Sequence, residues 1–596
     1  MNITRRDFLR TGTLLGAASF VPGGFRKLGA EALPADLTTL SATVIKGALL
    51  RSGTRGNYYR LAAGPGEKHL VRSELASRTA TTIGASLVNF VHITDVHLID
   101  AQSPARVEWM DRYNDLGCSS LLFASAFRAQ EALTLHVFEA MVRQIRAVGA
   151  SPVTGTPLGF AVSTGDNIDN EQFNELRWFI DMLDGGAQVA ANSGSKDVFE
   201  GVQSLAWGDA EYWHPDGGIT DKYKIHWGFP EYPGLLDDAI RPFGATGIGM
   251  PWYQTFGNHD GLVQGNFPRT RSLETIATGP LKVSGAPHGT NPCDPISSLL
   301  ANPDALLAAP SRPVTADADR RIVSRKQYVE EMFNTTGTPA GHGFTEANRT
   351  TGVAYWHKDE GLFRMIGLDT VNPGGHSDGS IGVAQLAWLE TKLKEVSSRY
   401  YDTSGNEVTT GNPDSLVMLF SHHGLRSINN PFNSPDPFDS SNNDYPRRSA
   451  SDIEKLVQRF PNVIAWVNGH SHKNIVVPRR ATGKNHGFWD IGTAAHIDFG
   501  CQSRLIEVTD NRDGTLSIFC TMIDHAAPVV PAGDDPVLRL ASISRELAAN
   551  EYQENADDGR GRAEDRNVEL VVKSPFALAS YSKFKGSKGK RPPGAG

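Results

Sequence analysis

Cysteine is scarce in this chain: its 596 residues include four, Cys118, Cys293, Cys501 and Cys520. No two of them form a Cys-x-x-Cys pair, the spacing typical of structural zinc knuckles and thiol redox motifs, so neither is expected. The even number leaves two interpretations open. One or two disulfides would form if the protein is exported, and otherwise the thiols would be free and buried.

A strong excess of one charge is also missing. Lysine and arginine number 58 and aspartate and glutamate 66, which gives a net charge of −8. Without a basic excess the chain has no electrostatic footprint for nucleic acid, so no nucleic-acid scaffold partner is expected. The small negative charge does not exclude a phosphate substrate, because bound metal cations dominate the field in a local site.

Long apolar runs and internal repeats are absent from the sequence as well. The apolar stretch at residues 12–21 is much shorter than the ~20 residues that a membrane-spanning helix needs. Hydrophobic residues make up 39% of the chain and charged residues 21%, values typical of a globular protein with a sizeable core. We therefore expect the mature protein to be soluble.

The beginning of the chain carries a targeting pattern. The run Thr-Arg-Arg-Asp-Phe-Leu-Arg at residues 4–10 resembles the twin-arginine export signal, and the apolar stretch at 12–21 follows it. Ala30-Glu31-Ala32 is a small-residue cleavage motif, so residues 1–32 are predicted to be a signal peptide. Export by the twin-arginine translocase would place the protein in the periplasm, the cell envelope or outside the cell. The alternative is a basic, disordered N-terminus.

Short apolar runs alternate with helical segments over most of the chain. In residues 171–183, apolar side chains recur at helical spacing, and further helices are expected at 124–148, 324–333 and 383–396. Strands are expected at 87–94, 159–163, 363–368, 416–420, 463–467, 488–491, 505–508 and 516–522. Strands that alternate with helices predict a layered α/β architecture.

Five polar clusters stand where apolar strands end. They are Asp95-Val96-His97, Gly165-Asp166-Asn167, Gly257-Asn258-His259-Asp260, Ser421-His422-His423 and Gly469-His470-Ser471-His472. In open α/β sheets, ligands gather at the carboxyl ends of strands, so these clusters are expected to converge in space.

The residue types in these clusters suit metal binding. Asp95 and His97 alternate around Val96, and on an extended strand end both side chains would point to one face. His470 and His472 have the same spacing. A pair of this kind can coordinate one cation.

Two further residues complete the expected set of ligands. Asp166 follows a glycine that permits close approach of the backbone, and a carboxylate has two oxygens that can bridge two cations. Asn258 offers a neutral amide oxygen. Oxygen and nitrogen ligands without thiolate favour manganese, iron, zinc or cobalt.

The order D-x-H, G-D, G-N-H-D, H-H and G-H-x-H resembles the calcineurin-like metallophosphoesterase superfamily, with G-N-H-D in place of the usual G-N-H-E. The segments 103–108, 341–345 and 489–498 resemble a bacterial, twin-arginine-exported subgroup. The resemblance implies a four-layer αββα sandwich and two divalent or trivalent metal ions. It implies that the first metal is held by Asp95, His97 and His472, the second by Asn258, His422 and His470, that Asp166 bridges them, and that His259 is the catalytic histidine.

The resemblance also divides the chain. It covers residues 85–525, the expected catalytic domain, with insertions at about 185–250 and 262–352. Residues 33–84 would form an N-terminal leader, 526–581 a C-terminal extension and 582–596 a disordered tail. Loops as long as these insertions are usually lids or disordered segments.

Four other residues have alternative interpretations. His423 adjoins the expected ligand His422, but neighbours on a strand point to opposite faces, so one of the two is expected to bind. His496 is expected to be a satisfied structural histidine rather than a group that supports a ligand. Arg106 and Arg128 have the geometry to clamp a phosphate, although a surface salt bridge is the expected role for each.

The expected function is metal-dependent hydrolysis of phosphate mono- or diesters, with a small-molecule or lipid phosphate ester as substrate. One alternative is a phospholipase or pyrophosphatase type of hydrolase on the same site. Another is a catalytically silent metal- or phosphate-binding protein of the cell envelope.

Overall fold

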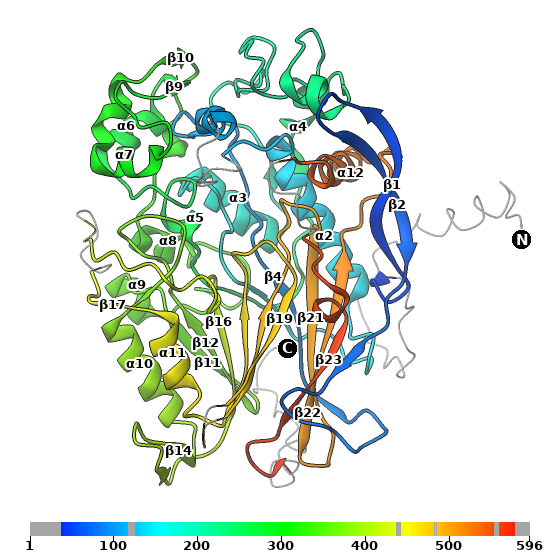
Figure 1. The fold of residues 1–596 in the computed structure, drawn as a ribbon, viewed down its shortest axis with the longest axis vertical. Coiled ribbons are helices and arrows are strands. Elements are labelled where there is room, and N and C mark those ends of the chain that lie inside the picture. The colour runs from blue at the N-terminus through cyan, green and yellow to red at the C-terminus, as the bar shows by residue number, and fades with distance from the viewer. Residues whose placement is uncertain are drawn as a thin grey trace, which may run out of the picture.

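Two large β-sheets packed face to face form the centre of the protein (Figure 1). The computed structural model describes residues 37–116, 126–434, 436, 443–481, 483, 486–552 and 559–578. The predicted signal peptide at 1–32 and tail at 582–596 lie outside these residues.

The first sheet has seven strands, and its order mixes segments from far apart in the chain. Neighbouring strands in it are β3 (Leu70–Arg72), β23 (Val568–Lys573), β22 (Thr515–Asp524), β21 (Gln502–Asp510), β4 (Ala85–Ile93), β5 (Phe160–Ser163) and β8 (Trp252–Gln254). Strands β4, β5 and β8 run parallel to one another, so their carboxyl ends meet at one edge.

The second sheet has six strands, all from the second half of the chain. Their order is β11 (Trp356–Glu360), β12 (Phe363–Leu368), β16 (Leu416–Ser421), β18 (Val463–Asn468), β20 (Phe488–Gly492) and β19 (Ile475–Arg479). Strands β12, β16, β18 and β20 are parallel, and β16 and β18 are buried throughout, as expected for strands covered on both faces.

Alternation along β16 shows how the layers are held together. Met418 and Phe420 face the core between the sheets, whereas Val417 and Leu419 face a separate core on the other side. Between the sheets, the ring of Phe420 meets that of Phe90 on β4 edge to face, with ring centres 5.8 Å apart. The Trp489 indole of β20 donates a hydrogen bond to the carbonyl of Val571 on β23.

Helices cover the outer face of each sheet (Figure 1). Helices α2 (Thr134–Val148) and α3 (Phe173–Asp184) lie on the seven-stranded sheet, and α12 (Pro536–Ala549) packs against α2. Helices α10 (Val383–Lys394) and α11 (Ala450–Val457) cover the six-stranded sheet. The predicted four-layer αββα sandwich is therefore confirmed.

Most of the expected elements are present within a few residues of their predicted bounds, including the eight strands and helices α3, α8 (Arg325–Glu331) and α10. The helix expected at 124–148 begins only at Thr134, after a short 3₁₀ turn at Glu131–Leu133. Its start was placed too early because the preceding residues are held in a turn. The Arg128 side chain pairs with Asp498, and the Gln130 side chain donates to the carbonyl of Ile497.

The two expected insertions contain structure of their own. The first holds α4 (Leu235–Ala239), a π-helical turn at Tyr223–Trp227 and the short pair β6 (Gln188–Val189) and β7 (Phe243–Gly244). Helix α5 (Asn258–Gly261) ends just before the second insertion. This insertion contains α6 (Arg271–Thr278), α7 (Pro295–Ala301), the 3₁₀ helix η5 (Pro303–Ala308), α8, α9 (Glu346–Thr351) and the pair β9 (Leu281–Val283) and β10 (Ser311–Pro313).

Segments on both sides of residues 85–525 add to the sandwich. A hairpin of β1 (Ala42–Ser52) and β2 (Asn57–Pro65) packs on α12, and β3 and β23 pair in parallel at one end of the seven-stranded sheet. Smaller pairs join β13 (Ile381–Gly382) to β17 (Arg447–Arg448) and β14 (Arg399–Tyr401) to β15 (Glu407–Thr409).

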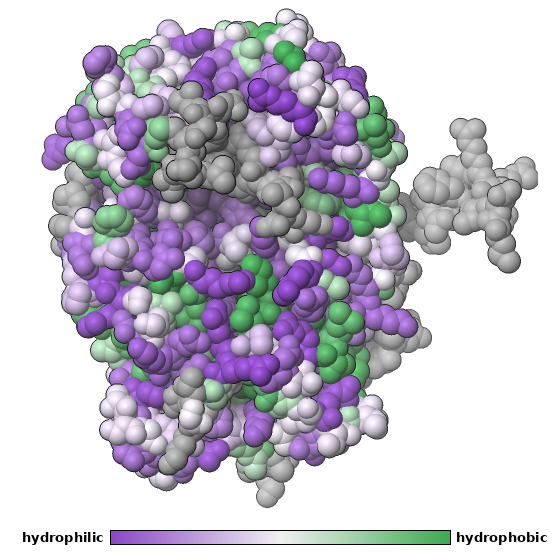
Figure 2. All heavy atoms as spheres, in the orientation of Figure 1, coloured by the Kyte–Doolittle hydropathy of each residue, from purple (hydrophilic) through white to green (hydrophobic). Residues whose placement is uncertain are grey.

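The surface and the cysteines are consistent with this layered core. Hydrophilic residues cover most of the face in Figure 2, with apolar residues in small groups. None of the helices in the described ranges has the length and apolar character needed to cross a bilayer.

Cys293 is disulfide-bonded, whereas Cys501 and Cys520 are buried free thiols. The prediction of a disulfide therefore holds for Cys293, and the alternative of free buried thiols holds for Cys501 and Cys520.

Candidate metal centre

The five polar clusters come together where strands of the two sheets end. Asp95 and His97 follow β4, Asp166 follows β5, and α5, which begins with Asn258 and His259, follows β8. From the other sheet, His422 follows β16 directly, and His470 and His472 follow β18. The structure therefore brings the eight predicted site residues to one region, and the potential ligand atoms of all but Asn258 lie within 4.8 Å of others in the set.

The backbone at five of these residues takes a conformation that side chains rarely adopt. The φ angles of Asp95, His97, Asp166, His470 and His472 are 50°, 47°, 50°, 65° and 55°. The argument that Asp95 and His97 alternate on an extended strand end was therefore wrong, as it was for His470 and His472. The strands end before these pairs, and left-handed residues turn the side chains inward instead.

One group of side chains consists of Asp95, His97 and His472. The Nε2 atoms of His97 and His472 are 3.2 Å apart, and Nε2 of His472 is 3.5 Å from Oδ1 of Asp95. Two imidazole nitrogens that face each other at this distance converge on a common point. A cation placed there would be held by both rings and by the Asp95 carboxylate.

A second group contains His422 and His470, and the predicted ligand Asn258 is supplied by the start of α5. Nε2 of His422 lies 3.2 Å from Nδ1 of His470. The amide nitrogen of Asn258 donates to the carbonyl of Gly265 at 3.1 Å, which fixes the amide so that its oxygen remains as the acceptor. The buried Oδ1 of Asn258 has no hydrogen-bond partner among the described residues.

Asp166 stands between the two groups. Its Oδ2 is 3.1 Å from Nε2 of His422 and 3.7 Å from Nε2 of His97, whereas its Oδ1 accepts a hydrogen bond from the backbone of His259 at 2.8 Å. Burial would raise the pKa of Asp166, but the charge of His422 and the other nearby histidines holds it well below its usual range. One carboxylate oxygen therefore faces a histidine from each group.

Glycines in the motifs leave room for these contacts. A Cβ atom at Gly469 would overlap Oγ1 of Thr94 and Oδ2 of Asp95, and one at Gly257 would overlap the Asp166 carboxylate. The backbone after β18 can approach Asp95 so closely that the N–H of His470 donates to its carboxylate at 2.9 Å. Glycine is required at both positions because any side chain would push the ligands apart.

A second set of oxygens holds the histidine rings from behind. Nδ1 of His97 lies 3.0 Å from Oδ1 of Asp169, and Nδ1 of His422 lies 2.9 Å from the carbonyl of Thr164. Nδ1 of His472 contacts the carboxylate of Asp498. An oxygen acceptor on one ring nitrogen keeps the proton there and leaves the opposite Nε2 free to bind a cation.

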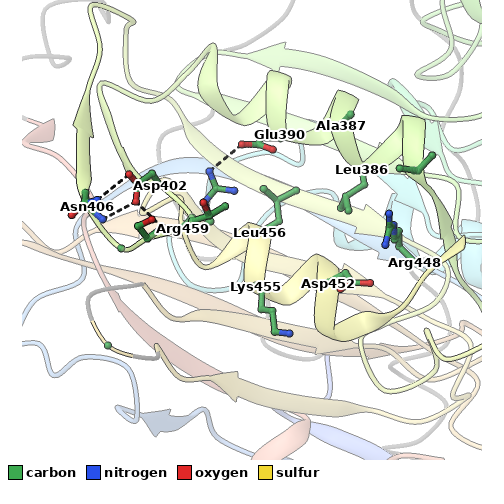
Figure 3. Close-up of a pocket in the computed structure, with 15 residues that line it drawn as sticks. Leu386, Ala387, Glu390, Asp402, Asn406, Arg448, Asp452, Lys455, Leu456 and Arg459 are labelled. Carbon is green, nitrogen blue, oxygen red and sulfur yellow. Dashed lines mark hydrogen bonds and ion pairs between the residues drawn. The ribbon is translucent and has the colours of Figure 1, made fainter. Parts of the chain in front are cut away.

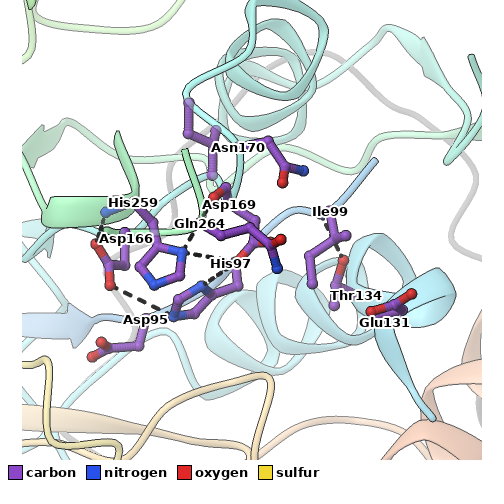
Figure 4. A network of polar contacts seen from close by, with 12 residues as sticks. Asp95, His97, Ile99, Glu131, Thr134, Asp166, Asp169, Asn170, His259 and Gln264 are labelled. Carbon is purple, nitrogen blue, oxygen red and sulfur yellow. Dashed lines mark hydrogen bonds and ion pairs between the residues drawn. The ribbon is translucent and has the colours of Figure 1, made fainter. Parts of the chain in front are cut away.

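His259 is oriented by the same aspartate as His97. Its Nδ1 is 2.9 Å from Oδ1 of Asp169, and its ring lies edge to face with that of His97 (Figure 4). Burial would lower the pKa of His259, but Asp166 and Asp169 raise it above its ordinary value. With its side chain 17% exposed, His259 is accessible at the edge of the site.

The donor set fits a pair of hard or borderline metal cations. The predicted ligands offer two carboxylates, four imidazoles and one amide oxygen, and among the described residues no cysteine belongs to a candidate metal group. Burial raises the pKa of the Cys501 thiol to about 12, so that thiol stays protonated and is no ligand. The unpartnered oxygen of Asn258 is a buried acceptor that a cation would satisfy. Manganese, iron, zinc and cobalt suit this mixture of oxygen and nitrogen.

Three carboxylates behind the predicted ligands were not predicted from the sequence. Asp169 contacts His97 and His259, Asp498 contacts His472, and the carboxylate of Asp378 lies 3.8 Å from Nε2 of His470. A signal existed for Asp169, which stands three residues after Asp166 in the same loop. No local pattern marks the other two, because their partners are distant in sequence.

Arg106 and Arg128 are buried, so the prediction of surface salt bridges was wrong. Arg106 pairs with Glu108, Glu131 and Asp169, and it is thus held behind the Asp169 carboxylate. Arg128 pairs with Asp498 at 3.0 Å. Both guanidinium groups neutralise carboxylates that orient histidines of the site, and they are engaged inside the protein rather than presented as a phosphate clamp.

His423 and His496 have partners of their own. The ring nitrogens of His423 lie 2.8 Å from Oγ1 of Thr370 and 2.8 Å from the carbonyl of Ser377, so both are engaged although the ring is near His470. Nε2 of His496 lies 2.9 Å from Oγ of Ser503, and burial lowers the pKa of His496 to about 3. These contacts suit structural roles.

One segment has the spacing of a serine nucleophile motif. Gly375-His376-Ser377-Asp378-Gly379 matches G-x-S-x-G, which in α/β-hydrolases lies on a sharp turn from a strand into a helix. Here the segment lies in turns between β12 and β13 and is followed by no helix until Val383. Ser377 is therefore not placed as a nucleophile.

The large hollow of Figure 3 lies elsewhere. It has a volume of about 860 Å³ and is lined by α10, α11 and the turn between β14 and β15. That hairpin precedes β16, so the hollow extends toward the amino ends of the strands, away from the metal centre. Among its charged groups, Arg459 pairs with Glu390 at 3.0 Å.

No profile of a known protein family matches the chain, and no curated protein matches its sequence. Among solved structures, it is similar to a dimetal phosphatase from Danio rerio, with 12% identity and a TM-score of 0.29 over 74% of this chain and 100% of that one. It is also similar to a putative 5'-nucleotidase from Staphylococcus aureus, with 11% identity and a TM-score of 0.26 over 77% of this chain and 58% of that one. A purple acid phosphatase from yellow lupin seeds gives 11% identity and a TM-score of 0.26 over 80% of this chain and 64% of that one. These TM-scores are too low to place the chain in a family, so the case for its chemistry rests on the side chains of the site.

Proposed function

We propose that the protein hydrolyses phosphate mono- or diesters at a dinuclear metal centre. The observation that carries this proposal is the position of Asp166, whose Oδ2 lies 3.1 Å from Nε2 of His422 and 3.7 Å from Nε2 of His97. A carboxylate oxygen that faces one histidine from each of two ligand groups is suited to bridging two cations.

The residues divide into two sets of ligands. Asp95, His97 and His472 would hold one cation, Asn258, His422 and His470 the other, and Asp166 both. When bound there, two cations polarise the phosphoryl group and activate water for attack on phosphorus. The acceptors behind the rings, such as Asp169 behind His97 and Thr164 behind His422, bind Nδ1 and so direct the opposite Nε2 toward the cation site.

His259 would act as a general acid that protonates the leaving group. Asp169 binds its Nδ1, which turns Nε2 outward, and the imidazolium would donate the Nε2 proton to the ester oxygen as the bond to phosphorus breaks. Such general acid catalysis typically contributes about 10²–10⁴-fold to the rate. A protein that only binds metal or phosphate has no need of this arrangement, which is why we prefer the enzyme to the silent binding protein.

The test is hydrolysis of paired generic phosphate mono- and diesters by the purified protein with added manganese, with a chelator and as the Asp166→Asn variant. We expect turnover that requires the metal and is lost in the variant. The substituted amide keeps the size of the side chain but carries no negative charge, so its oxygen would be a much weaker bridge between two cations.

The exposed Asp319, which pairs with Arg321 at the surface, offers a matched control. Asp319→Asn should retain wild-type turnover. Bound metal without turnover on any ester would favour the binding-protein alternative, and turnover of pyrophosphates alone would favour the pyrophosphatase alternative.

The proposal also includes export by the twin-arginine translocase to the periplasm, the envelope or the medium. It is supported by the Arg5-Arg6 pair in its motif. Replacing both by lysine should retain the protein in the cytoplasm, which cell fractionation with immunoblotting would detect. Unchanged export of the doubly substituted chain would refute this route.

A further inference from the structure

A second cavity lies beside the metal centre, in the insertion that follows α5. Its volume is about 430 Å³. The lining is mostly apolar and comes from α6, α7, η5 and the segments around Phe267 and Phe432; it includes Phe267, Leu273, Leu299, Leu300, Leu306 and Phe432. We call it the apolar pocket.

One wall of the apolar pocket continues from the catalytic histidine. The turn at Gly265 packs so tightly on His259 and Asn258 that a Cβ atom there would overlap both side chains, and its carbonyl accepts from Asn258. Phe267, which lines the pocket, is two residues further on. Two residues span at most about 7 Å of extended chain, so this wall begins next to the reacting centre.

A second, adjoining wall continues from the second group of predicted ligands. His376 lines the pocket and stacks on Phe432 with ring centres 4.6 Å apart. Two residues later, the Asp378 carboxylate lies 3.8 Å from Nε2 of His470. The backbone of His376 donates to the carbonyl of Asn266 at 3.0 Å, which ties this wall to the first one.

From this continuity we infer that the apolar pocket binds an alkyl chain of the substrate that is attached through the phosphate ester. This inference rests on the proposed function and narrows its substrate class. Each wall is two residues along the chain from a residue that contacts the candidate site, so a substituent on a phosphoryl group held there has only a short distance to cover to reach the pocket.

The chemistry of the lining agrees with such a group. Ligand pockets of about 300–1,000 Å³ are typically apolar with a few polar groups that set orientation. At the rim, Arg269 is engaged with Glu274 at 2.5 Å, and no carboxylate lines the cavity in the described part of the chain. A sugar or other polyhydroxyl group would find few partners among leucine, proline and phenylalanine side chains.

The experiment measures kcat/KM for 4-nitrophenyl phosphodiesters whose second substituent is methyl, butyl or octyl, with manganese present. We expect kcat/KM to rise about fourfold for each buried methylene until the pocket is filled. In Leu300→Ser and in Phe432→Ser, the ratio of butyl to methyl kcat/KM should fall about tenfold or more, because apolar contact is lost. Phe432 is 44% exposed, so its replacement removes little from the core.

Leu307, 58% exposed in η5 and outside the cavity lining, provides the matched control. Leu307→Ser should keep the wild-type ratio. A wild-type ratio near one would overturn the inference while leaving the proposed function intact. Failure to hydrolyse even the methyl ester with metal present would instead count against the proposed function itself.

Discussion

Left-handed backbone conformations at Asp95, His97, Asp166, His470 and His472 place the residues of the site under local strain. Each costs of order 1–3 kcal/mol and persists only where the surroundings impose it. Backbone hydrogen bonds between the loops supply that constraint, for example from His97 to the carbonyl of Asp166 at 2.9 Å. The ligand loops are therefore set in position by one another before any cation binds.

Substitution of one motif glycine should show how tightly these loops are packed. Gly469→Ala would bring a methyl group onto Thr94 and Asp95, and we expect a loss of about 1–3 kcal/mol in the free energy of unfolding together with weaker metal binding. Gly411, whose Cβ would meet nothing within 4 Å, is the control. Urea unfolding and metal analysis of both variants test this, and equal stability of the two would contradict it.

The shared role of Asp169 gives a second prediction at this scale. In Asp169→Asn, the acceptor that orients both His97 and His259 is replaced by an amide that keeps its shape. Changes behind a metal ligand typically cost about 10–100-fold in affinity or activity, and we expect kcat/KM to fall by at least that much. Steady-state kinetics at saturating manganese measures it, with Asp319→Asn as control. A fall confined to KM, with kcat unchanged, would contradict the role given to Asp169.

At the scale of elements, strand β9 attaches the helical insertion to the network behind the site. Its Lys282 is fully buried and bonds to Glu108 at 2.8 Å and to the carbonyl of Ser103 at 2.6 Å. Glu108 in turn pairs with Arg106, which holds Asp169. The insertion that lines the apolar pocket is thus coupled to the carboxylate that orients His259.

Removal of the lysine tests this coupling. Lys282→Ala leaves Glu108 with one buried positive partner fewer, and truncating one member of a buried pair typically costs about 3–5 kcal/mol. We expect a drop of that order in the free energy of unfolding, measured by urea denaturation. The exposed Lys358 of β11 should tolerate the same substitution within about 0.5 kcal/mol. Similar stability of the two variants would contradict the role given to Lys282.

Elements differed in how far the sequence could predict them. Buried strands such as β16 and β18 are continuous apolar runs, so they were identified almost to the residue. Helices α6, α7 and α9 were missed because they have six to eight residues and carry little periodicity. Their caps were the available signal: the side chain of Thr270 caps α6, and Asp294 followed by Pro295 begins α7.

For the molecule as a whole, metal binding should add to stability. Ligands that bind the native state stabilise it by about 2.7 kcal/mol at a hundredfold excess over Kd. We expect manganese to raise the melting temperature of the metal-free protein in a concentration-dependent way, and Asp166→Asn to reduce that rise. Calorimetry measures both. Equal shifts in the two proteins would mean that the cation binds somewhere other than around Asp166.

For the candidate site as a whole, the residues that converge could be predicted from the sequence, but the residues that support them could not. Each ligand cluster is contiguous in sequence and follows an apolar strand, so the residues could be found without knowing the fold. The supports depend on pairing across the molecule: Arg128 meets Asp498 from 370 positions away, and Arg106 meets Asp169 from 63. No spacing rule links such residues, which is why both arginines were taken for surface groups.

The chain distance between the two halves of the centre also has a consequence in time. His97 and His472, whose Nε2 atoms are 3.2 Å apart, are separated by 375 positions. At about 5–20 residues per second, a ribosome needs roughly 20–75 s to make the intervening chain. Asp95, His97 and Asp166 therefore emerge long before their partner histidines, and complete coordination can arise only near the end of translation. On the proposed function, the two cations could therefore be held together only after His472 has been made.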